Sequence, residues 1–507
     1  FSDRPVSLLV EDCSPHACNL HGCSIRSKRV TRTNLWKSED DVGARVNNGA
    51  VATQAAVIPG GKLTFAKHRQ TLQILFPVAG IQHRVAPKRH TNDREFSMYD
   101  PTFGSASLAQ QLNKNDFLKQ PTLKSDAHKE AVIAQAVSTA RNGFASLPLT
   151  PENLAGRTIF QVNDLASDLV LRKAARNIRR ITASKQASRI EIIRRLKLFC
   201  EEGMPFTVAK MDIKSFYPSV DQEALSNQLN RRLVTAPSTR SVISSLIDQC
   251  KSKSVGGLPP GLAISAELSE FYMQDFDRQM RELLGAHYFA RYVDDIILVL
   301  PELDSPKNLK NRIEVALPKG LKLNFSKSKI FVFGDAKVNS PAVEHSFDYL
   351  GFKFSVFQTN KNRPCFRSVE LDIAASKVKK NKTRVVKSLL QYLSDSNFQD
   401  LRDRVRILTC GYQFFDERQQ QKRSAGLQHT YSLIERDAPA LGELDRFFAG
   451  IVLCRSGSIG GRLALTLTNC ERKELLRYSF VTGVANRVHF RFNADRLAHL
   501  MECWKYA

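Results

Sequence analysis

The sequence lacks a hydrophobic run long enough to span a membrane. No stretch of about 18 apolar residues occurs in the 507-residue chain, so no transmembrane helix is expected. The opening, FSDRPVSLLVEDCS, has neither a basic segment nor a long apolar segment, so no signal peptide is expected either. The chain does not begin with Met, which leaves its true N-terminus open. We therefore interpret the ten cysteines as reduced thiols and expect a cytoplasmic protein without a membrane partner.

Acidic residues are scarce relative to basic ones. The chain contains 50 Asp and Glu against 75 Lys and Arg, which gives a formal net charge of +25. A charge of that size points to a polyanionic partner, with nucleic acid as the first candidate. A basic protein without such a partner is the alternative. The hydrophobic content of 42% is typical of a globular protein, and the length allows two to four domains.

Residues 1–105 show no clear pattern and are predicted to form an N-terminal extension of unclear fold. Five residues of metal-binding type lie close together there: Cys13, His16, Cys18, His21 and Cys23. Cys and His at short spacing can bind zinc. The second, distant pair of a zinc finger is absent, so a structural zinc site stays open.

Apolar residues recur at helical spacing through residues 106–205, which are predicted to be mostly helical. In SRIEIIRRLKLFCEEG, the residues Ile190, Ile193, Leu196 and Phe199 share one side, and Gly203 follows the end of the helix. The segment just upstream, LRKAARNIRRITASKQASR, is dense in basic residues. It is either a solvated basic face or a surface that binds phosphates.

Two adjacent carboxylates, Asp294 and Asp295, interrupt the apolar stretch YFARYVDDIILVL. A third, Asp212, ends the alternating strand at the start of FTVAKMDIKSFYPSV. Like charges repel, and burial of a charge is costly, so these acids need cations. We predict a hairpin with the acids at its tip, where Asp212 and Asp294 bind two Mg²⁺ ions about 3.5–4 Å apart for phosphoryl transfer. Mn²⁺ is the alternative ion, and the basic residues would bind the nucleic-acid backbone.

Five segments in this order resemble the palm of reverse transcriptases. They are DIKSFYPS, GLPPG with Ser265 four residues after Gly261, YVDD, SKSK and YLGF, and the resemblance covers about Val170 to Phe354. It implies an α+β, right-hand polymerase fold of fingers, palm and thumb, with a ferredoxin-like palm and a mostly helical C-terminal region. The implied boundaries are fingers 106–205, palm 206–360, and thumb with C-terminal domain 361–507.

Within that lineage the chain is most similar to the bacterial, defence-associated class linked to abortive infection, with retron and group II intron enzymes as relatives. The segment NIRRITASKQASRIEIIRRL leading into DIKSFYPSV carries this likeness. It implies an RNA template, with a dedicated noncoding RNA in antiphage defence, dNTPs as substrates and a DNA product. Template-independent or protein-primed synthesis, a retron or group II intron role, and a non-catalytic RNA-binding scaffold stay open, as do a homo-oligomer and a partner protein.

The resemblance also assigns the site residues. Asp212 and Asp294 would be the principal metal ligands, Asp295 a supporting acid, and the carbonyl of Ile213 a further ligand. Lys327 matches the lysine near the leaving pyrophosphate and would act as a general acid, with Lys329 as the competing choice. The primer grip matches Tyr349, Leu350 and Gly351.

Nucleotide and backbone contacts follow from the same likeness. Tyr217 would stack under the incoming sugar and exclude a 2′-hydroxyl, Gly261 would let the backbone approach the nucleotide, and Ser265 would lie beside the template. Pro260 departs from the Gln usual in the family. The triphosphate would contact Arg179 or, as second choice, Arg189. Four lysines of the thumb would follow the duplex backbone: Lys377, Lys379, Lys380 and Lys382.

Overall fold

The structure is a computed structural model. It describes residues 99–154, 156–182, 188–231, 235–282, 285–301, 306–336, 342–358, 365–416 and 421–505. All of these belong to one compact unit, residues 92–507. Most of the predicted extension 1–105 lies outside the described residues, as do its candidate zinc ligands Cys13, His16, Cys18, His21 and Cys23. Among the helices that are described, none is long and apolar enough to cross a membrane.

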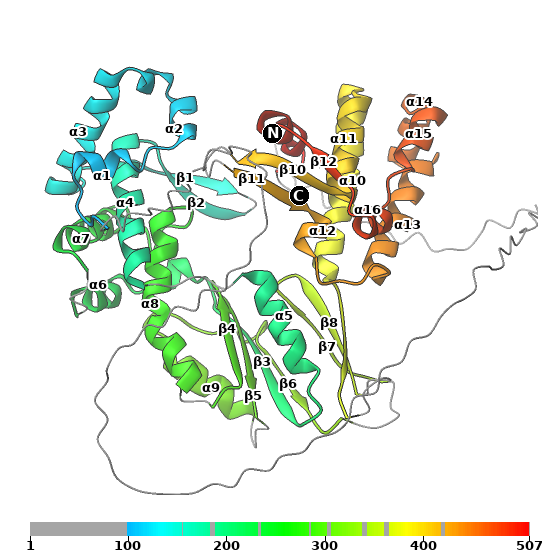
Figure 1. The fold of residues 1–507 in the computed structure, drawn as a ribbon, viewed down its shortest axis with the longest axis horizontal. Helices are drawn as coiled ribbons and strands as arrows, with labels where there is room; N and C mark the ends of the chain where they lie inside the picture. Colours follow the sequence, from blue (N-terminus) through cyan, green and yellow to red (C-terminus); the bar gives the residue numbers. More distant parts are fainter. Residues whose placement is uncertain are drawn as a thin grey trace, which may run out of the picture. The chain divides into compact units, whose positions relative to one another are not determined.

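A four-stranded antiparallel sheet carries the three aspartates (Figure 1). Its strands are β3 (Phe206–Asp212), β4 (Tyr288–Tyr292), β5 (Asp295–Leu300) and β6 (Lys329–Phe333), in the order β4-β5-β3-β6. β4 and β5 form the predicted hairpin, and β3 lies between β5 and β6. The predicted strand ending at Asp212 and the predicted hairpin with Asp294 and Asp295 at its tip are therefore confirmed.

Both faces of β3 are buried, which explains its nearly continuous apolar sequence. Val208 belongs to one hydrophobic cluster, whereas Ala209 and Met211 belong to another. Side chains alternate across a strand, so the two clusters lie on opposite faces of the sheet. Asp212 follows Val208 at even spacing and therefore lies on the same face as Val208, at the end of the strand.

Helices cover both faces of this sheet. α8 (Ala263–Glu282) and α9 (Pro306–Ala316) contribute Leu268 and Ile313 to the cluster that contains Met211. α5 (Arg189–Cys200) contributes Ile193 to the cluster that contains Val208. Figure 1 shows α5 lying over the strands of this sheet. The predicted apolar side of α5 is confirmed in part: Ile193 and Leu196 are buried, whereas Ile190 and Phe199 are only partly buried against the same cluster.

The segment before β3 is helical with one added hairpin. Its helices are α1 (Ser105–Ala109), α2 (Lys114–Lys119), η1 (Pro121–Lys124), α3 (Asp126–Asn142) and α4 (Leu165–Thr182). The hairpin pairs β1 (Leu149–Leu154) with β2 (Arg157–Val162), which the sequence pattern did not predict. Between β3 and α8 lie η2 (Tyr217–Ser219), α6 (Gln222–Arg231) and α7 (Pro237–Ser252).

A second antiparallel sheet follows the first. It consists of β7 (Val343–Tyr349), β8 (Phe352–Phe357) and β9 (Ser368–Ile373) in sequence order. The β7–β8 turn contains Leu350 at φ 46° and Gly351 at φ 82°. Two residues with positive φ are typical of a tight hairpin turn whose twist matches its strands. The chain then enters α10 (Ala375–Asp395) and α11 (Phe398–Thr409).

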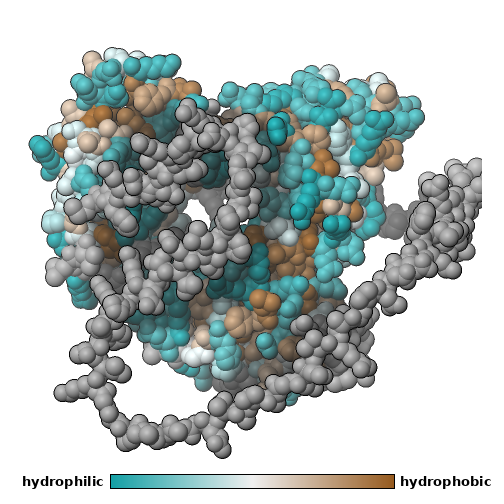
Figure 2. All heavy atoms as spheres, in the orientation of Figure 1, coloured by the Kyte–Doolittle hydropathy of each residue, from teal (hydrophilic) through white to brown (hydrophobic). Residues whose placement is uncertain are grey.

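The C-terminal region is mostly helical, as predicted, but it also contains a three-stranded sheet. Its strands are β10 (Gly411–Asp416), β11 (Gln421–Gly426) and β12 (His489–Arg491), in the order β11-β10-β12. β11 reads QKRSAG and β12 has three residues, so neither shows the alternation that predicts a strand. The helices are α12 (Leu427–Thr430), α13 (Pro439–Leu453), α14 (Gly457–Thr466), α15 (Asn469–Leu475), α16 (Phe480–Ala485) and α17 (Ala494–Glu502). Hydrophilic residues cover much of the face drawn in Figure 2, with hydrophobic ones in smaller groups.

Candidate active site

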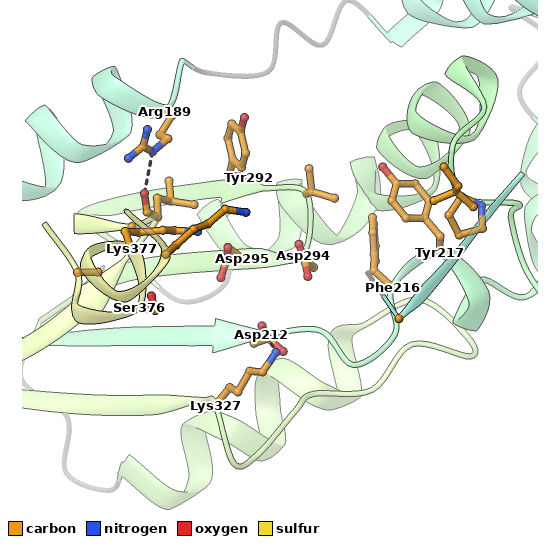
Figure 3. Close-up of a pocket in the computed structure, with 18 of the residues that line it drawn as sticks. Arg189, Asp212, Phe216, Tyr217, Tyr292, Asp294, Asp295, Lys327, Ser376 and Lys377 are labelled. Atoms are coloured by element: carbon orange, nitrogen blue, oxygen red, sulfur yellow. Dashed lines mark hydrogen bonds and ion pairs between the residues drawn. The ribbon is translucent and has the colours of Figure 1, made fainter. Parts of the chain in front are cut away.

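The three predicted aspartates meet at one end of the sheet, where β3 ends and β5 begins. We call the group of Asp212, Asp294 and Asp295 the acid edge. Asp212 lies opposite Asp295 in the antiparallel register, and Asp294 lies in the turn between β4 and β5. Directly opposed residues have Cβ atoms about 4.5–5.5 Å apart. Figure 3 shows the three carboxylates directed toward one another. Strand pairing therefore brings together acids that are 82 positions apart in the sequence, from 212 to 294.

The turn that carries Asp294 is strained. Val293 has φ 60°, a left-handed conformation that is a true outlier for a β-branched residue. Such a residue costs about 1–3 kcal/mol and persists only where its surroundings enforce it. One enforcing contact comes from β3, because the N–H of Ile213 donates to the carbonyl of Asp294 at 3.1 Å. The backbone after Asp212 thus fixes the turn that carries the second acid.

The cluster carries excess negative charge. Burial raises the pKa of Asp295 from 3.8 to about 6, and the charges of Asp294 and Asp212 add to this shift, while Lys210 and Lys327 oppose it. The Lys327 Nζ atom lies 3.5 Å from Asp212 Oδ1, with an ammonium that is mostly exposed. The positive charges of Lys210 and Lys327 offset the charges of the three acids only in part. A divalent cation would complete the balance.

The donor set fits Mg²⁺ bound together with substrate. In the part of the chain that the structure describes, no group of three or more His, Cys, Asp or Glu side chains forms a ready metal cage. Mg²⁺ in polymerase-type sites is bound by one or two carboxylates plus substrate phosphates, so a protein cage is not required. Asp212 and Asp294 would supply the carboxylates, next to the backbone of Ile213. Bound there, the ions would stabilise charge on the attacking and leaving oxygens.

The acids face a cleft of about 2160 Å³. That volume exceeds the 300–1,000 Å³ of ordinary small-molecule sites, so the cleft suits a polymer. Its wall includes residues of the β1–β2 hairpin, the sheet edge, the β7–β8 turn and α10. Twelve predicted site residues line it: Arg189, Asp212, Ile213, Tyr217, Asp294, Asp295, Lys327, Tyr349, Leu350, Gly351, Lys377 and Lys380.

Tyr217 lines the cleft beside Phe216, at the start of η2 (Figure 3). Its phenol is half-buried, and burial raises its pKa against the effect of a hydrogen bond to Ser269 on α8. The ring is therefore fixed in the cleft wall near the Asp294 turn. A fixed ring at this point is a suitable steric barrier for a substrate hydroxyl.

Five predicted residues do not line the cleft. Arg179 donates to Glu267 with its Nε atom at 2.8 Å, and the Ser265 hydroxyl is buried and donates to the Pro259 carbonyl at 2.7 Å. Gly261 has φ 104°, and a Cβ there would lie 2.7 Å from the Phe160 carbonyl. Ser265 and Gly261 thus pack against backbone groups beside the cleft, whereas Arg179 is an exposed side chain paired with Glu267. The other two are Lys379 and Lys382; the competing Lys329 does not line the cleft either.

Arg189 lines the cleft but is engaged with protein groups. Its Nε atom donates to the Leu350 carbonyl at 2.7 Å (Figure 3), and its guanidinium lies 4.8 Å and 5.1 Å from the ring centres of Phe352 and Tyr431. These contacts connect α5 to the β7–β8 turn and to the region after β11. Arg189 thus supports the turn that was predicted as the primer grip.

Only one side of α10 faces the cleft. Lys377, Lys380 and Arg384 line it, at spacings of three and four residues. Burial lowers the pKa of Lys380, and so do the neighbouring charges of Arg384 and Lys377. Lys382 instead pairs with Glu443 at 2.7 Å. Helical periodicity alone could have shown that Lys377, Lys380 and Arg384 share one side of α10 and that Lys379 and Lys382 lie on another. It would also have added Arg384 to the predicted backbone contacts.

Two further residues of the site were not singled out from the sequence. Lys210 lines the cleft two residues before Asp212 and opposes the pKa shift of Asp295. Arg291 is buried directly before the Tyr292–Asp295 segment and donates to the Val293 carbonyl at 3.1 Å. The sequence did contain a signal for Arg291, because an arginine within an apolar strand is expected to be buried and a buried cation needs polar partners.

No curated protein matches the chain. A solved structure that it resembles is apo telomerase from Candida tropicalis, truncated from the C-terminal domain, at 15% identity and a TM-score of 0.28. The match covers 45% of this chain and 54% of the telomerase chain, so it spans about half the length of that structure.

Residues 167–354 match the reverse transcriptase (RNA-dependent DNA polymerase) family. The matched range contains the acid edge and most of the residues that precede α10 in the cleft wall. The predicted α+β right-hand polymerase fold is thereby confirmed. The chain therefore contains a segment that resembles a reverse transcriptase domain, and this segment covers less than half of its length.

Proposed function

We propose that this chain adds dNTPs to a 3′ end on an RNA template, with two Mg²⁺ ions bound by Asp212 and Asp294. The single observation that carries the proposal is the meeting of three carboxylates at a sheet edge that faces a cleft of about 2160 Å³, inside the reverse transcriptase match. The resemblance implies an RNA template, dNTPs and a DNA product. Mn²⁺ is the alternative ion.

The chemistry is divided between acids and a lysine. Asp212 and Asp294 bind the ions, and Asp295 tunes the charge of the cluster from the start of β5. Lys327 holds a proton at Nζ, 3.5 Å from Asp212 Oδ1, and donates it to the leaving pyrophosphate. Lys329 is exposed on β6 outside the cleft wall, so the geometry favours Lys327 for this role.

The cleft wall supplies selection and alignment. Tyr217 blocks the space that a 2′-hydroxyl requires. The turn at Tyr349, Leu350 and Gly351 supports the primer end, and Arg189 stabilises that turn through the Leu350 carbonyl. The contacts of Gly261 and Ser265 support a role in fixing the wall behind the nucleotide, and the exposed Arg179, which pairs with Glu267, is the remaining candidate for the triphosphate. Lys377 and Lys380 contact backbone phosphates from α10.

We further propose a bacterial setting in which the enzyme acts in the cytoplasm with a dedicated noncoding RNA in antiphage defence. The likeness of the segment from Asn177 to Leu196, followed by DIKSFYPSV, to defence-associated enzymes supports this setting. A phage challenge of cells that express the chain tests it. Protection that disappears in Asp294→Asn is expected, and equal plaque counts with and without the chain contradict it.

Nucleotide incorporation by the purified chain tests the polymerase proposal. Labelled dNTPs are supplied with a primed RNA template, and the copurifying nucleic acid is sequenced. Template-directed extension that needs Mg²⁺ is the expected result. Extension without template indicates template-independent synthesis, and label bound covalently to protein indicates protein priming. Binding of RNA without any incorporation contradicts the proposal and favours the scaffold.

A further inference from the structure

Arg291 makes a hydrogen-bond network that the proposed chemistry does not use directly. Its side chain is 3% exposed, and all five of its N–H donors have acceptors. Four of them bind the carboxylates of Glu270 and Asp277 on α8, at 2.8–3.0 Å. The fifth, from Nη1, goes to the carbonyl of Val293 at 3.1 Å. One side chain therefore joins helix α8 to the turn that carries Asp294.

The turn needs such a restraint. Val293 is held at φ 60°, a conformation that a valine leaves readily unless its neighbours prevent it. Its carbonyl bonds to Arg291, and the next carbonyl, of Asp294, accepts from the N–H of Ile213. The turn is thus held from two sides, by the helix through Arg291 and by β3 through Ile213.

We propose that Arg291 is a positioning residue that keeps the strained Val293 turn, and with it the Asp294 carboxylate, in the geometry that nucleotide transfer requires. The inference rests on the proposed function for its effect on catalysis. The guanidinium is suited to this task because its planar fork is itself fixed by two carboxylates, so the fifth donor cannot swing away. A lysine in its place keeps the charge but has three donors and no fork.

The matched comparison uses a second buried arginine. Arg367 is fully buried, binds Glu344 at 2.8 Å and donates to backbone carbonyls, including that of Met204. It does not line the cleft and has no contact with the turn. Arg291→Lys and Arg367→Lys therefore make the same chemical change at two buried sites, and only the first touches the Asp294 turn.

The experiment has two readouts. Hydrogen exchange of the metal-free protein, without nucleic acid, reports the turn itself. Arg291→Lys should speed exchange at residues 292–295 and at the Ile213 amide, while Arg367→Lys should leave these positions unchanged. Steady-state incorporation should show a loss in kcat of about 10- to 100-fold for Arg291→Lys, with the KM for dNTP nearly unchanged. Arg367→Lys should retain kcat even if its Tm falls.

A rescue variant tests the strain. Glycine adopts positive φ without a Cβ clash, so Val293→Gly should recover several-fold of the kcat lost in Arg291→Lys. If Arg291→Lys does not fold, Glu270→Gln, which keeps an acceptor but weakens the fork, takes its place with the same expectations. Unchanged exchange at the turn, or an equal loss of kcat in both lysine variants, overturns the proposal. If the parent protein incorporates no nucleotide, the proposed function fails, while the exchange data still decide whether Arg291 restrains the turn.

Discussion

The acid edge and helix α10 are two charged regions of one cleft, and they are built differently. At the acid edge, Asp212 is 8% exposed, and strand register and backbone hydrogen bonds fix its position relative to the turn. On α10, Lys377 and Lys380 are exposed side chains on a regular helix. The proposed function of the acids thus depends on their exact placement. The proposed binding by the lysines depends on how many there are and on which side of the helix they lie. Substitutions should affect the two regions through different observables.

Loss of one acid should produce the largest effect. Asp212→Asn and Asp294→Asn each remove a metal ligand worth several kcal/mol of transition-state stabilisation, so incorporation should fall by about 10³-fold or more. Nucleic-acid binding should persist, because the basic wall is intact. Incorporation assays and a binding titration measure the two properties. Asp275→Asn, at a half-buried α8 acid paired with Arg278, is the control. Parent-like rates in either acid variant would exclude this edge as the catalytic centre.

Sugar selection should show the next largest effect. Tyr217→Ala should lower the preference for dATP over ATP by about 10–200-fold, if the ring excludes the 2′-hydroxyl as we propose. Tyr217→Phe retains the ring and should keep the preference. Single-nucleotide incorporation with each triphosphate gives the ratio. Equal discrimination by Tyr217→Ala and the parent would assign the barrier to another residue.

The two sides of α10 should differ in salt dependence. Each phosphate contact contributes about 0.7–0.9 to the log–log slope of affinity against salt, so Lys377→Ala with Lys380→Ala should lower the slope by about 1.4–1.8. Lys379→Ala with Lys382→Ala removes the same charge from outside the cleft and should leave the slope nearly unchanged. Affinities at several salt concentrations, on two template sequences, decide this. Equal slopes for both pairs would mean that α10 does not follow the backbone.

The smallest effect concerns Asp295 in the metal-free protein. A carboxyl whose pKa is raised from 3.8 to about 6 adds stability below its ordinary pKa, and this stability is lost as pH rises through about 6. Between pH 4 and pH 7, the parent should therefore lose on the order of 1–3 kcal/mol of unfolding free energy relative to Asp295→Asn. Urea unfolding in the presence of a chelator measures this loss. Parallel pH curves for the two proteins would contradict the raised pKa.

Much of the acid edge could be predicted from sequence, because local pattern determined it. Alternation in β3 placed Asp212 at a strand end, and the apolar run around Asp294 indicated a hairpin. Hydrophobic alternation did not predict β11 and β12, because neither QKRSAG nor a three-residue strand contains an alternating pattern. Pairing with β10 forms those strands, and pairing partners are not visible locally.

The sequence by itself determined the residue types of the site, the strands that carry the acids and the basic character of the wall. Only the tertiary structure decided which cations face the cleft. Arg179 bonds to Glu267, which is 88 residues away, and Arg189 bonds to the Leu350 carbonyl, which is 161 residues away. The guanidinium of Arg291 is fixed by hydrogen bonds to Glu270 and Asp277 on helix α8. Hydrogen-bond partners are set by contacts between distant segments, so residue type and spacing alone leave them undetermined.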